Sequence, residues 1–265
     1  MFELHRCALV GMVHLLPLPG SPGWRGSMQE VREAALRDAQ RLVRGGVDAL
    51  LVENMGDVPY LKGGVPPETV AAVTQVTTQV VGLGLPVGVQ ILAGANLEAM
   101  AVAAVCGAQF VRVEGFAYAH VADEGWIDAC AGPLLRARAA LGAAVSVWAD
   151  VQKKHAAHAV TADLSVQALA RGAAFCGADA LILTGGETGA PTDPAHLAAA
   201  RAAGLPVVVG SGVDEHNAAE LAGIADALIV GTSLKERGDW RRPVDVERVA
   251  RLATIVRAAP DGRAQ

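Results

Sequence analysis

Three carboxylates and one histidine end apolar runs of the sequence, and side chains of these types could exchange protons with a bound substrate. Glu53 ends the run ALLVE, Glu114 ends FVRVE, and Asp150 ends VSVWAD. His14 ends the first run, ALVGMVH. A carboxylate among apolar residues costs free energy unless it is paired or used in chemistry, and histidine titrates near neutral pH. We therefore expect these four side chains to be catalytic.

Structural roles are the alternative for two of these residues. Arg112 lies two positions before Glu114, and so on the same face of the strand, where it could neutralise the Glu114 carboxylate inside the protein. His14 could be a core residue whose ring is held by one hydrogen bond. If His14 instead stands beside Glu53, we expect its imidazole to exchange a proton with substrate near neutral pH.

A basic segment, DVQKKHAAH, starts at Asp150 and carries Lys153, Lys154 and His155. Adjacent lysines point in different directions, so we expect at most one of the pair to face the site. A lysine near a strand end can form a Schiff base with a carbonyl or bind phosphate as a point charge. We place Lys154 and His155 in the catalytic set, and a solvated basic loop is the alternative.

Two glycine-rich turns, VGSGV from Val209 and VGTSLKERG from Val230, are typical of anion sites. Their glycines expose successive backbone N–H groups, and the positive end of a following helix adds to the attraction. A tight turn without a ligand is the alternative. The residues expected to bind phosphate are Gly210, Ser211, Gly212, Gly231 and Thr232. Polar residues at other strand ends and in the segment TGGETGAP are expected to bind substrate: Asn54, Gln90, Thr184, Glu187 and Thr188.

A repeated pattern of helix end, glycine turn and apolar strand positions these residues. It recurs in GGVDALLVEN, CGAQFVRVEG, CGADALILTG and AGIADALIVGT, and in GLPVGVQILAG, GAAVSVWAD and GLPVVVGSG. With a first strand at 7–15, this makes eight apolar strands alternating with helical stretches such as SMQEVREAALRDAQRLVRGG. Strands without polar alternation form parallel sheets covered on both faces. We expect an α/β protein, a (β/α)₈ TIM barrel of the phosphate-binding type with its site at the carboxyl ends of the strands. A doubly wound open sheet is the alternative.

Length and composition favour a single barrel domain over residues 1–265, because no linker or charge block divides the chain. The long connection FAYAHVADEGWIDACAG, after the fourth strand, is expected to be a lid or a partner surface. The net charge of −5 argues against nucleic acid as a partner. From the N-terminal residues and the short apolar runs, we expect neither a signal peptide nor a segment that crosses a membrane. We expect a cytoplasmic homo-oligomer whose four cysteines are buried thiols.

A divalent metal ion is a further alternative at the strand ends. The carboxylates of Glu53, Glu114 and Asp150, together with His14, could hold one, because hard cations prefer oxygen ligands. No ligand-spacing motif supports such a site, so we assign no metal ligands and leave the cofactor unknown.

Six motifs, in order along the chain, resemble those of the BtpA/SgcQ family: GMVHLLPLPGSP, VDALLVENMGD, ADVQKKHA, TGGETGAP, VGSGV and VGTSLKERGDWRRPVD. The resemblance extends from Ala8 to about Arg257. It implies a TIM-barrel fold. The family takes its name from a cyanobacterial protein that supports photosystem I biogenesis and associates peripherally with thylakoid membranes, and other members are linked to sugar metabolism or to nucleotide cleavage. The resemblance assigns no catalytic residues.

Two functions from different classes follow. The first is an enzyme, namely a lyase, isomerase or hydrolase of a phosphorylated small molecule such as a sugar phosphate or a nucleotide-like compound. The second is a non-catalytic assembly or stability factor for a membrane complex such as photosystem I. Carboxylates and phosphate-type turns at one mouth favour the enzyme, because a scaffold has no need of them. No basic amphipathic helix for membrane docking is visible in the sequence.

Overall fold

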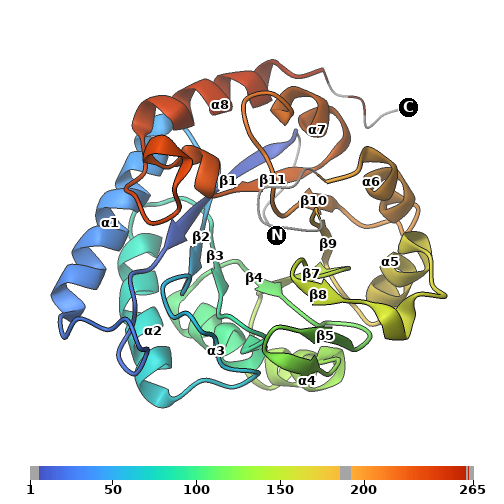
Figure 1. Cartoon of the computed structure of the whole chain (residues 1–265), viewed down its shortest axis with the longest axis horizontal. Helices are drawn as coiled ribbons and strands as arrows, with labels where there is room; N and C mark the ends of the chain where they lie inside the picture. Colours follow the sequence, from blue (N-terminus) through green and yellow to red (C-terminus); the bar gives the residue numbers. More distant parts are fainter. Residues whose placement is uncertain (1–5, 186–191, 261, 263–265) are drawn as a thin grey trace.

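Eight parallel strands close into a barrel, and helices on its outside connect each strand to the next (Figure 1). The computed structural model describes residues 6–185, 192–260 and 262. In chain order, the barrel strands are β1 (Ala8–His14), β2 (Ala49–Glu53), β3 (Val87–Gln90), β4 (Phe110–Val113), β7 (Ser146–Asp150), β9 (Ala180–Leu183), β10 (Val207–Val209) and β11 (Ala227–Val230). Because β11 pairs with β1, the predicted barrel is confirmed and the open sheet is excluded.

The outer layer of the barrel is helical. Its helices are α1 (Met28–Gly45), α2 (Pro67–Val81), α3 (Asn96–Cys106), α4 (Ala131–Ala140), α5 (Val166–Phe175), α6 (Pro194–Arg201), α7 (Ala218–Ile224) and α8 (Val246–Ala258), with short 3₁₀ turns η1 (Ala159–Thr161), η2 (Thr232–Leu234) and η3 (Glu236–Gly238). The sequence signals for α1 act as expected. The hydroxyl of Ser27 accepts a hydrogen bond from the Glu30 N–H, and Gly46, with φ of 93°, ends the helix in the left-handed region.

The interior of the barrel is packed below the mouth and is not a channel. The rings of Phe110 and Trp148 stack with their centroids 4.1 Å apart. Gly88 provides the room for them, because a Cβ at this position would lie 2.2 Å from the Phe110 ring. Side chains alternate between the two faces of a strand, so Arg112 and Asp150, two residues further along, also point into the barrel. The aromatic pair therefore forms the floor beneath the polar strand ends.

Strand register brings three of the predicted site residues to one level. His14 is paired with Glu53 across β1 and β2, and Glu53 is paired with Gln90 across β2 and β3. Neighbouring Cα atoms in a sheet are about 5 Å apart. The backbone alone therefore fixes these side chains as neighbours.

The long connection after β4 is partly regular structure. It contains an antiparallel hairpin of β5 (His120–Ala122) and β6 (Gly125–Ile127), and β8 (Ala156–Ala157), from the segment after β7, pairs with β5. The hairpin turn, Asp123 and Glu124, reaches the mouth of the barrel. This position suits the expected lid, while the alternative of a partner surface stays a prediction.

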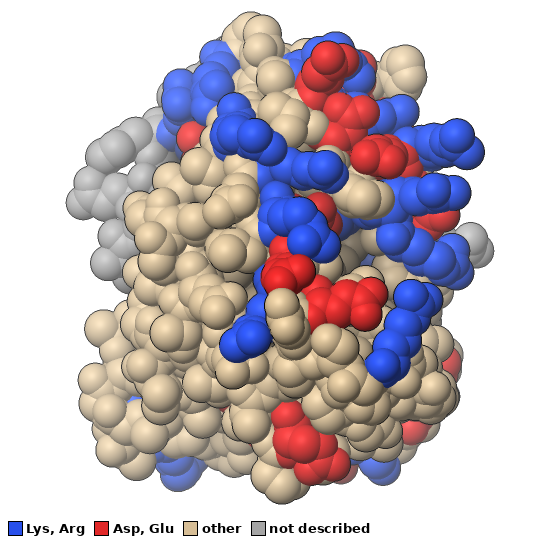
Figure 2. Space-filling view, turned by 90° about the vertical axis from the view of Figure 1, so that its left-hand side faces the viewer, with Lys and Arg blue, Asp and Glu red and all other residues tan. Residues whose placement is uncertain are grey.

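The face of the molecule beside α1 carries acidic and basic side chains next to one another (Figure 2). On α1 itself, Arg37 Nη1 lies 3.6 Å from Glu33 Oε2. Because both signs of charge are interspersed, the electrostatic potential of this face does not have a single sign. Within the described ranges, no helix combines the length and the apolar character that crossing a membrane requires.

The four cysteines form no disulfide. Cys7 is buried, as expected, whereas Cys106, Cys130 and Cys176 are half-buried. The expectation of complete burial is wrong for these three because they lie at helix ends, at the last residue of α3, the N-cap of α4 and the C-cap of α5, where side chains are only partly covered.

Candidate active site

The carboxyl ends of the barrel strands surround a cavity of about 510 Å³. This volume suits a small metabolite. The predicted site residues that line the cavity are His14, Glu53, Gln90, Glu114, Lys154, His155, Gly210, Ser211, Gly212, Gly231 and Thr232. Asp150, Asn54 and Thr184 are not among the residues that line the cavity, and Glu187 and Thr188 lie outside the described residues.

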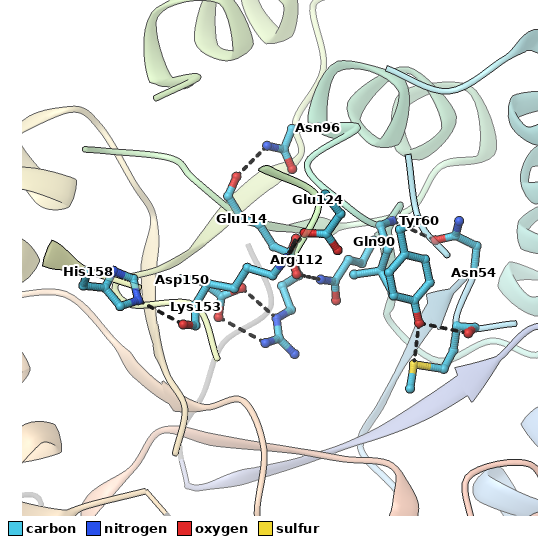
Figure 3. Close-up of polar contacts among 12 residues, drawn as sticks. Asn54, Tyr60, Gln90, Asn96, Arg112, Glu114, Glu124, Asp150, Lys153 and His158 are labelled. Atoms are coloured by element: carbon cyan, nitrogen blue, oxygen red, sulfur yellow. Dashed lines mark hydrogen bonds and ion pairs between the residues drawn. The ribbon is translucent and has the colours of Figure 1, made fainter. Parts of the chain in front are cut away.

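Asp150 is held by Arg112. Arg112 donates from Nε to Oδ2 and from Nη2 to Oδ1 of Asp150, both at 3.1 Å (Figure 3). The two side chains are 6% and 1% exposed, respectively. Arg112 Nη1 also donates to the carbonyl of Gly210 at 3.1 Å. Arg112 therefore forms its ion pair with Asp150 and not with Glu114, the partner that the sequence offered as an alternative. This bidentate pair positions the strand ends of β4 and β7 against the turn after β10.

Glu114 is the carboxyl group best suited to exchange a proton near neutral pH. Its Oε1 accepts a hydrogen bond from Gln90 Nε2 at 3.2 Å, and its Oε2 lies 3.4 Å from Lys153 Nζ (Figure 3). Burial raises the pKa of Glu114 to about 7, although Lys153 acts in the opposite direction. Asn96 Nδ2 donates to the Glu114 carbonyl at 2.7 Å and fixes the backbone. A carboxyl with such a pKa can serve as acid or base at physiological pH.

The adjacent lysines both line the cavity but differ in their partners. Lys153 Nζ lies 3.0 Å from Glu124 Oε2, in addition to its contact with Glu114. Lys154, by contrast, forms no ion pair with any carboxylate of the described residues. Burial and then the charge of Arg112 lower the pKa of Lys154. The expectation that at most one lysine faces the site is wrong, because the segment after β7 turns both toward the mouth.

His14 and Glu53 lie side by side, with Nε2 and Oε2 3.5 Å apart and each side chain 8% exposed. Burial lowers the pKa of His14 to about 3, with smaller contributions from Lys235 and Lys154, and burial raises the pKa of Glu53. His14 therefore lines the cavity as a neutral ring. The pKa of His14 thus lies below the neutral range that the sequence suggested, because burial and the nearby cations disfavour the charged ring.

The turns after β10 and β11, where the sequence predicts an anion site, form one wall of the cavity. Ser211 Oγ is buried and has no hydrogen-bond partner among the residues that the structure describes. Gly212 has a φ of 72°, which favours glycine. Gly231 packs against His14, because a Cβ at this position would lie 2.8 Å from His14 Cε1. Arg248, from α8, also lines the cavity and adds a positive charge.

Two predicted substrate-binding residues instead hold loops together. Asn54 Oδ1 accepts a hydrogen bond from the Leu92 N–H at 2.7 Å, and Asn54 Nδ2 donates to Asp57 Oδ2 at 2.9 Å. Thr184 Oγ1 donates to the carbonyl of Gln152 at 3.2 Å. Because these polar atoms are engaged within the protein, their contacts do not support a role in substrate binding.

Sequence reasoning missed several residues that line the cavity from loops and from α8: Met55, Tyr60, Asp123, Glu124 and Arg248. Tyr60 donates from its hydroxyl to the Met55 carbonyl at 3.0 Å, and burial raises its pKa (Figure 3). None of these residues ends a strand, so the pattern that located Glu53 could not find them. The only signal in the sequence was their place in polar segments that follow or precede a barrel strand.

The described residues contain no group of three or more His, Cys, Asp or Glu side chains placed to hold a metal ion. The carboxylates expected to do so have other partners. Asp150 is held by Arg112, and Glu114 is in contact with Gln90 and Lys153. The contacts of Asp150 and Glu114 thus give no support to the divalent-metal site, which stays an alternative from the sequence.

Known structures share this fold. Phosphoribosyl anthranilate isomerase from Thermus thermophilus is similar with a TM-score of 0.57 and 15% sequence identity, covering 96% of this chain and 100% of that chain. KGPDC from Streptococcus mutans is similar with a TM-score of 0.63 and 11% identity, covering 96% and 99% of the two chains. At such identities the likeness shows the TIM-barrel fold alone.

Relatives found by sequence have a higher identity to this chain than these two structures do. A protein of Caenorhabditis elegans described as mitochondrial is 40% identical over 255 residues, covering 93% of this chain and 92% of the relative. The photosystem I biogenesis protein BtpA of Synechocystis is 38% identical over 255 residues, covering 94% and 87%. The sequence profile of the BtpA family matches residues 5–258, in agreement with the resemblance of the six motifs. The chain belongs to the BtpA family.

Proposed function

We propose that the protein is an enzyme that binds a small phosphorylated molecule, such as a sugar phosphate or nucleotide-like compound, in the barrel cavity. The observation that carries this proposal is the buried Ser211 hydroxyl, which lacks a partner among the described residues and lines the cavity. A buried polar group without a partner costs about 1–3 kcal/mol. A phosphate oxygen would accept from this hydroxyl and from the backbone N–H groups of Gly212, Gly231 and Thr232.

The position of these turns supports the proposal. Phosphate-binding barrels frequently hold the anion after their seventh and eighth strands, which here are β10 and β11. The name of one structural neighbour points the same way, because it is an isomerase of phosphoribosyl anthranilate, a phosphorylated compound.

The opposite side of the mouth supplies groups for acid–base chemistry. Glu114 has a pKa of about 7, and burial also raises the pKa of Glu53, which lies beside the neutral His14. Two carboxyl groups in different surroundings can take separate acid and base roles. Arg112, which lines the cavity, keeps a positive charge near both. Proton transfer of this kind suits a lyase, an isomerase or a hydrolase.

A role in assembling a membrane complex is the second candidate function, and the name of the Synechocystis relative favours it. Such a role needs an outer surface rather than the cavity. Substitutions at Glu114 or Ser211 would then leave it intact. The cytoplasmic location, the homo-oligomeric state and the absence of a nucleic-acid partner stay predictions.

Thermal unfolding in inorganic phosphate tests the proposed anion site. A ligand at a hundred times its Kd stabilises the native state by about 2.7 kcal/mol, so phosphate should raise the Tm of the wild type. Ser211→Ala should retain or slightly raise the Tm without ligand, because it removes an unpartnered hydroxyl, and should reduce the shift caused by phosphate.

The matched control is Ser27→Ala, far from the cavity. The Ser27 hydroxyl accepts from the Glu30 N–H at 3.2 Å, and loss of such a cap costs about 1 kcal/mol. This variant should have a lower Tm and an unchanged response to phosphate. A wild type that shows no shift in tens of millimolar phosphate would contradict the proposal.

A further inference from the structure

The chain has four lysines, and the structure gives each a different environment. Lys62 is exposed. Lys153 pairs with two carboxylates, and Lys235 is 1% exposed and lies 2.6 Å from Asp38. Lys154 lines the cavity without a carboxylate partner in the part of the chain that is described. Among the described residues, Lys154 is the lysine that lines the cavity and forms no ion pair.

We propose that Lys154 is the amine nucleophile of the site and forms an imine with the carbonyl carbon of a phosphorylated aldehyde or ketone. This inference rests on the proposed function, because the phosphate of the substrate lies in the turns after β10 and β11. It narrows the substrate class to carbonyl compounds. It also narrows the reaction to isomerisation or aldol-type cleavage, in which an iminium group accepts the electron pair of a breaking C–H or C–C bond.

The other cations of the cavity are held by protein groups. Arg112 is bidentate with Asp150, and Arg248 Nη1 donates to the carbonyl of Ser233 at 3.2 Å. Lys154, by contrast, is a cation of the cavity lining with no such partner among the described residues. A lysine whose only task is to bind phosphate needs no carboxylate partner, and a high pKa would keep its amine protonated. Burial and the neighbouring Arg112 instead favour the neutral amine, which is the form that attacks a carbonyl.

The place of Lys154 in the barrel fits a substrate that extends across the mouth. Lys154 follows β7, the fifth barrel strand, whereas the glycine turns follow the seventh and eighth. A cavity of about 510 Å³ accommodates a small phosphorylated sugar between these two walls. Glu53 lines the same cavity as Lys154, and its charge raises the pKa of Lys154, so it is the carboxyl group that we assign to proton transfer.

The step balances without an oxidant or reductant. The Lys154 Nζ lone pair forms an N–C bond as the carbonyl π pair moves to oxygen, and that oxygen takes a proton from the Glu53 carboxyl. The nitrogen then returns a proton to the Glu53 carboxylate. The hydroxyl takes this proton and leaves as water while the nitrogen lone pair forms the C=N bond. The products are a protonated imine, water and a Glu53 carboxylate that can act as the next base.

Reductive trapping tests the proposal. The full chain is mixed with D-ribose 5-phosphate, glyceraldehyde 3-phosphate or dihydroxyacetone phosphate. Sodium cyanoborohydride then reduces any imine to a stable secondary amine, which peptide mass spectrometry locates. We expect at least one probe to label Lys154 about tenfold or more above the exposed Lys62, because binding raises the local concentration of the carbonyl. Unphosphorylated glyceraldehyde should label Lys154 less, and excess inorganic phosphate should suppress the labelling.

Two variants sharpen the test. Lys154→Arg should remove the label while retaining the phosphate-induced rise in Tm, because it removes the nucleophile and leaves the turns after β10 and β11 unchanged. Lys153→Arg keeps a cation beside Glu114 and should leave Lys154 labelled. If phosphate raises the Tm but no probe labels Lys154 above Lys62, the imine is overturned and the phosphate site stands.

Failure of the proposed function gives a different result. In that case phosphate does not raise the Tm of the wild type. If glyceraldehyde and glyceraldehyde 3-phosphate then label Lys154 at equal rates, the phosphate is not recognised. That result would overturn the proposed substrate class of phosphorylated aldehydes and ketones.

Discussion

The imidazole of His14 and the carboxyl of Glu53 lie 3.5 Å apart, Nε2 to Oε2, at the ends of the neighbouring strands β1 and β2. Burial lowers the pKa of His14 to about 3 and raises the pKa of Glu53. Both effects favour the neutral forms, because taking a charge out of water costs free energy. The two groups are therefore neighbours in contact rather than a permanent ion pair, and Glu53 is the member of the pair that can release a proton to a substrate.

His14→Gln should weaken ligand binding without changing the pH dependence between pH 6 and 8. Glutamine keeps one donor and one acceptor, and the ring that it replaces has a pKa of about 3 and stays neutral across this range. We expect a loss of about 1–2 kcal/mol in the free energy of unfolding, from altered packing and one hydrogen bond. Urea unfolding and binding isotherms at several pH values measure both effects. Loss of a titration near neutral pH in this variant would show that His14 carries the proton.

Glu114→Gln should change how stability depends on pH. The folded protein keeps the Glu114 proton up to its pKa of about 7, whereas the unfolded chain loses it near the ordinary value of 4.5. Between these values the native state binds more protons, so its stability falls as pH rises, by up to about 3 kcal/mol from this group. Glutamine does not titrate and escapes this loss. The advantage of Glu114→Gln over the wild type should therefore grow from pH 4.5 to pH 7 and then level off.

The matched control for this measurement is Glu33→Gln, on the exposed side of α1. Its carboxylate forms a surface pair with Arg37, so its replacement should give a small difference from the wild type at every pH. Urea titrations at intervals of pH compare the three proteins. A flat difference for Glu114→Gln would mean that Glu114 is ionised at neutral pH and does not serve as an acid there.

Asp150→Asn should destabilise the protein strongly. Asparagine leaves the buried Arg112 guanidinium without its charged partner, and breaking a buried pair in this way costs about 3–5 kcal/mol. A catalytic role for Asp150 by itself would predict lost activity with an intact fold, but the bidentate contact implies that stability falls too. Differential scanning calorimetry should show a fall in Tm of about 10 °C. Glu215→Gln, which removes the exposed partner of Arg251, should change the Tm by far less.

The barrel was predictable because its signals are local. Apolar strands that follow glycine turns, and helices with caps such as Ser27 and Gly46, specify the elements one at a time. The same logic located His14, Glu53 and Glu114, since each stands at a strand end and the strand ends of a barrel meet at one mouth. Local pattern therefore predicts the fold and the position of the site.

The partners within the site were not predictable in the same way. Arg112 points into the barrel between two carboxylates, Glu114 on its own segment and Asp150 on the neighbouring strand. Which of the two carboxylates pairs with Arg112 depends on the register of β4 against β7. This register places Arg112 beside Trp148 and so brings Asp150 within reach of the guanidinium group. The charge state of His14 likewise depends on depth of burial and on Lys235, which is distant in sequence. Such quantities arise from tertiary packing, and no motif carries them.

Gly231→Ala should push the His14 ring away from its position beside Glu53. The backbone of Gly231 has a φ of −122°, which other residues also adopt, so the lack of room for a Cβ is what requires glycine. An added methyl group would lie 2.8 Å from His14 Cε1 and 3.3 Å from Met12 Cβ. Overpacking of this kind costs about 1–3 kcal/mol. The phosphate-induced shift in Tm should also shrink, because the turn after β11 must move.

A double-mutant cycle isolates this contact. Removing the ring first, in His14→Ala, makes room for the methyl group, so Gly231→Ala should cost much less in that background than in the wild type. The difference between the two costs, measured by urea unfolding, should reach about 1 kcal/mol or more for residues in direct contact. An equal cost in both backgrounds would mean that Gly231 is required by the backbone of the turn and not by His14. In that case the anion-binding turn and the His14–Glu53 pair would act independently, and phosphate binding should be unaffected by His14→Ala.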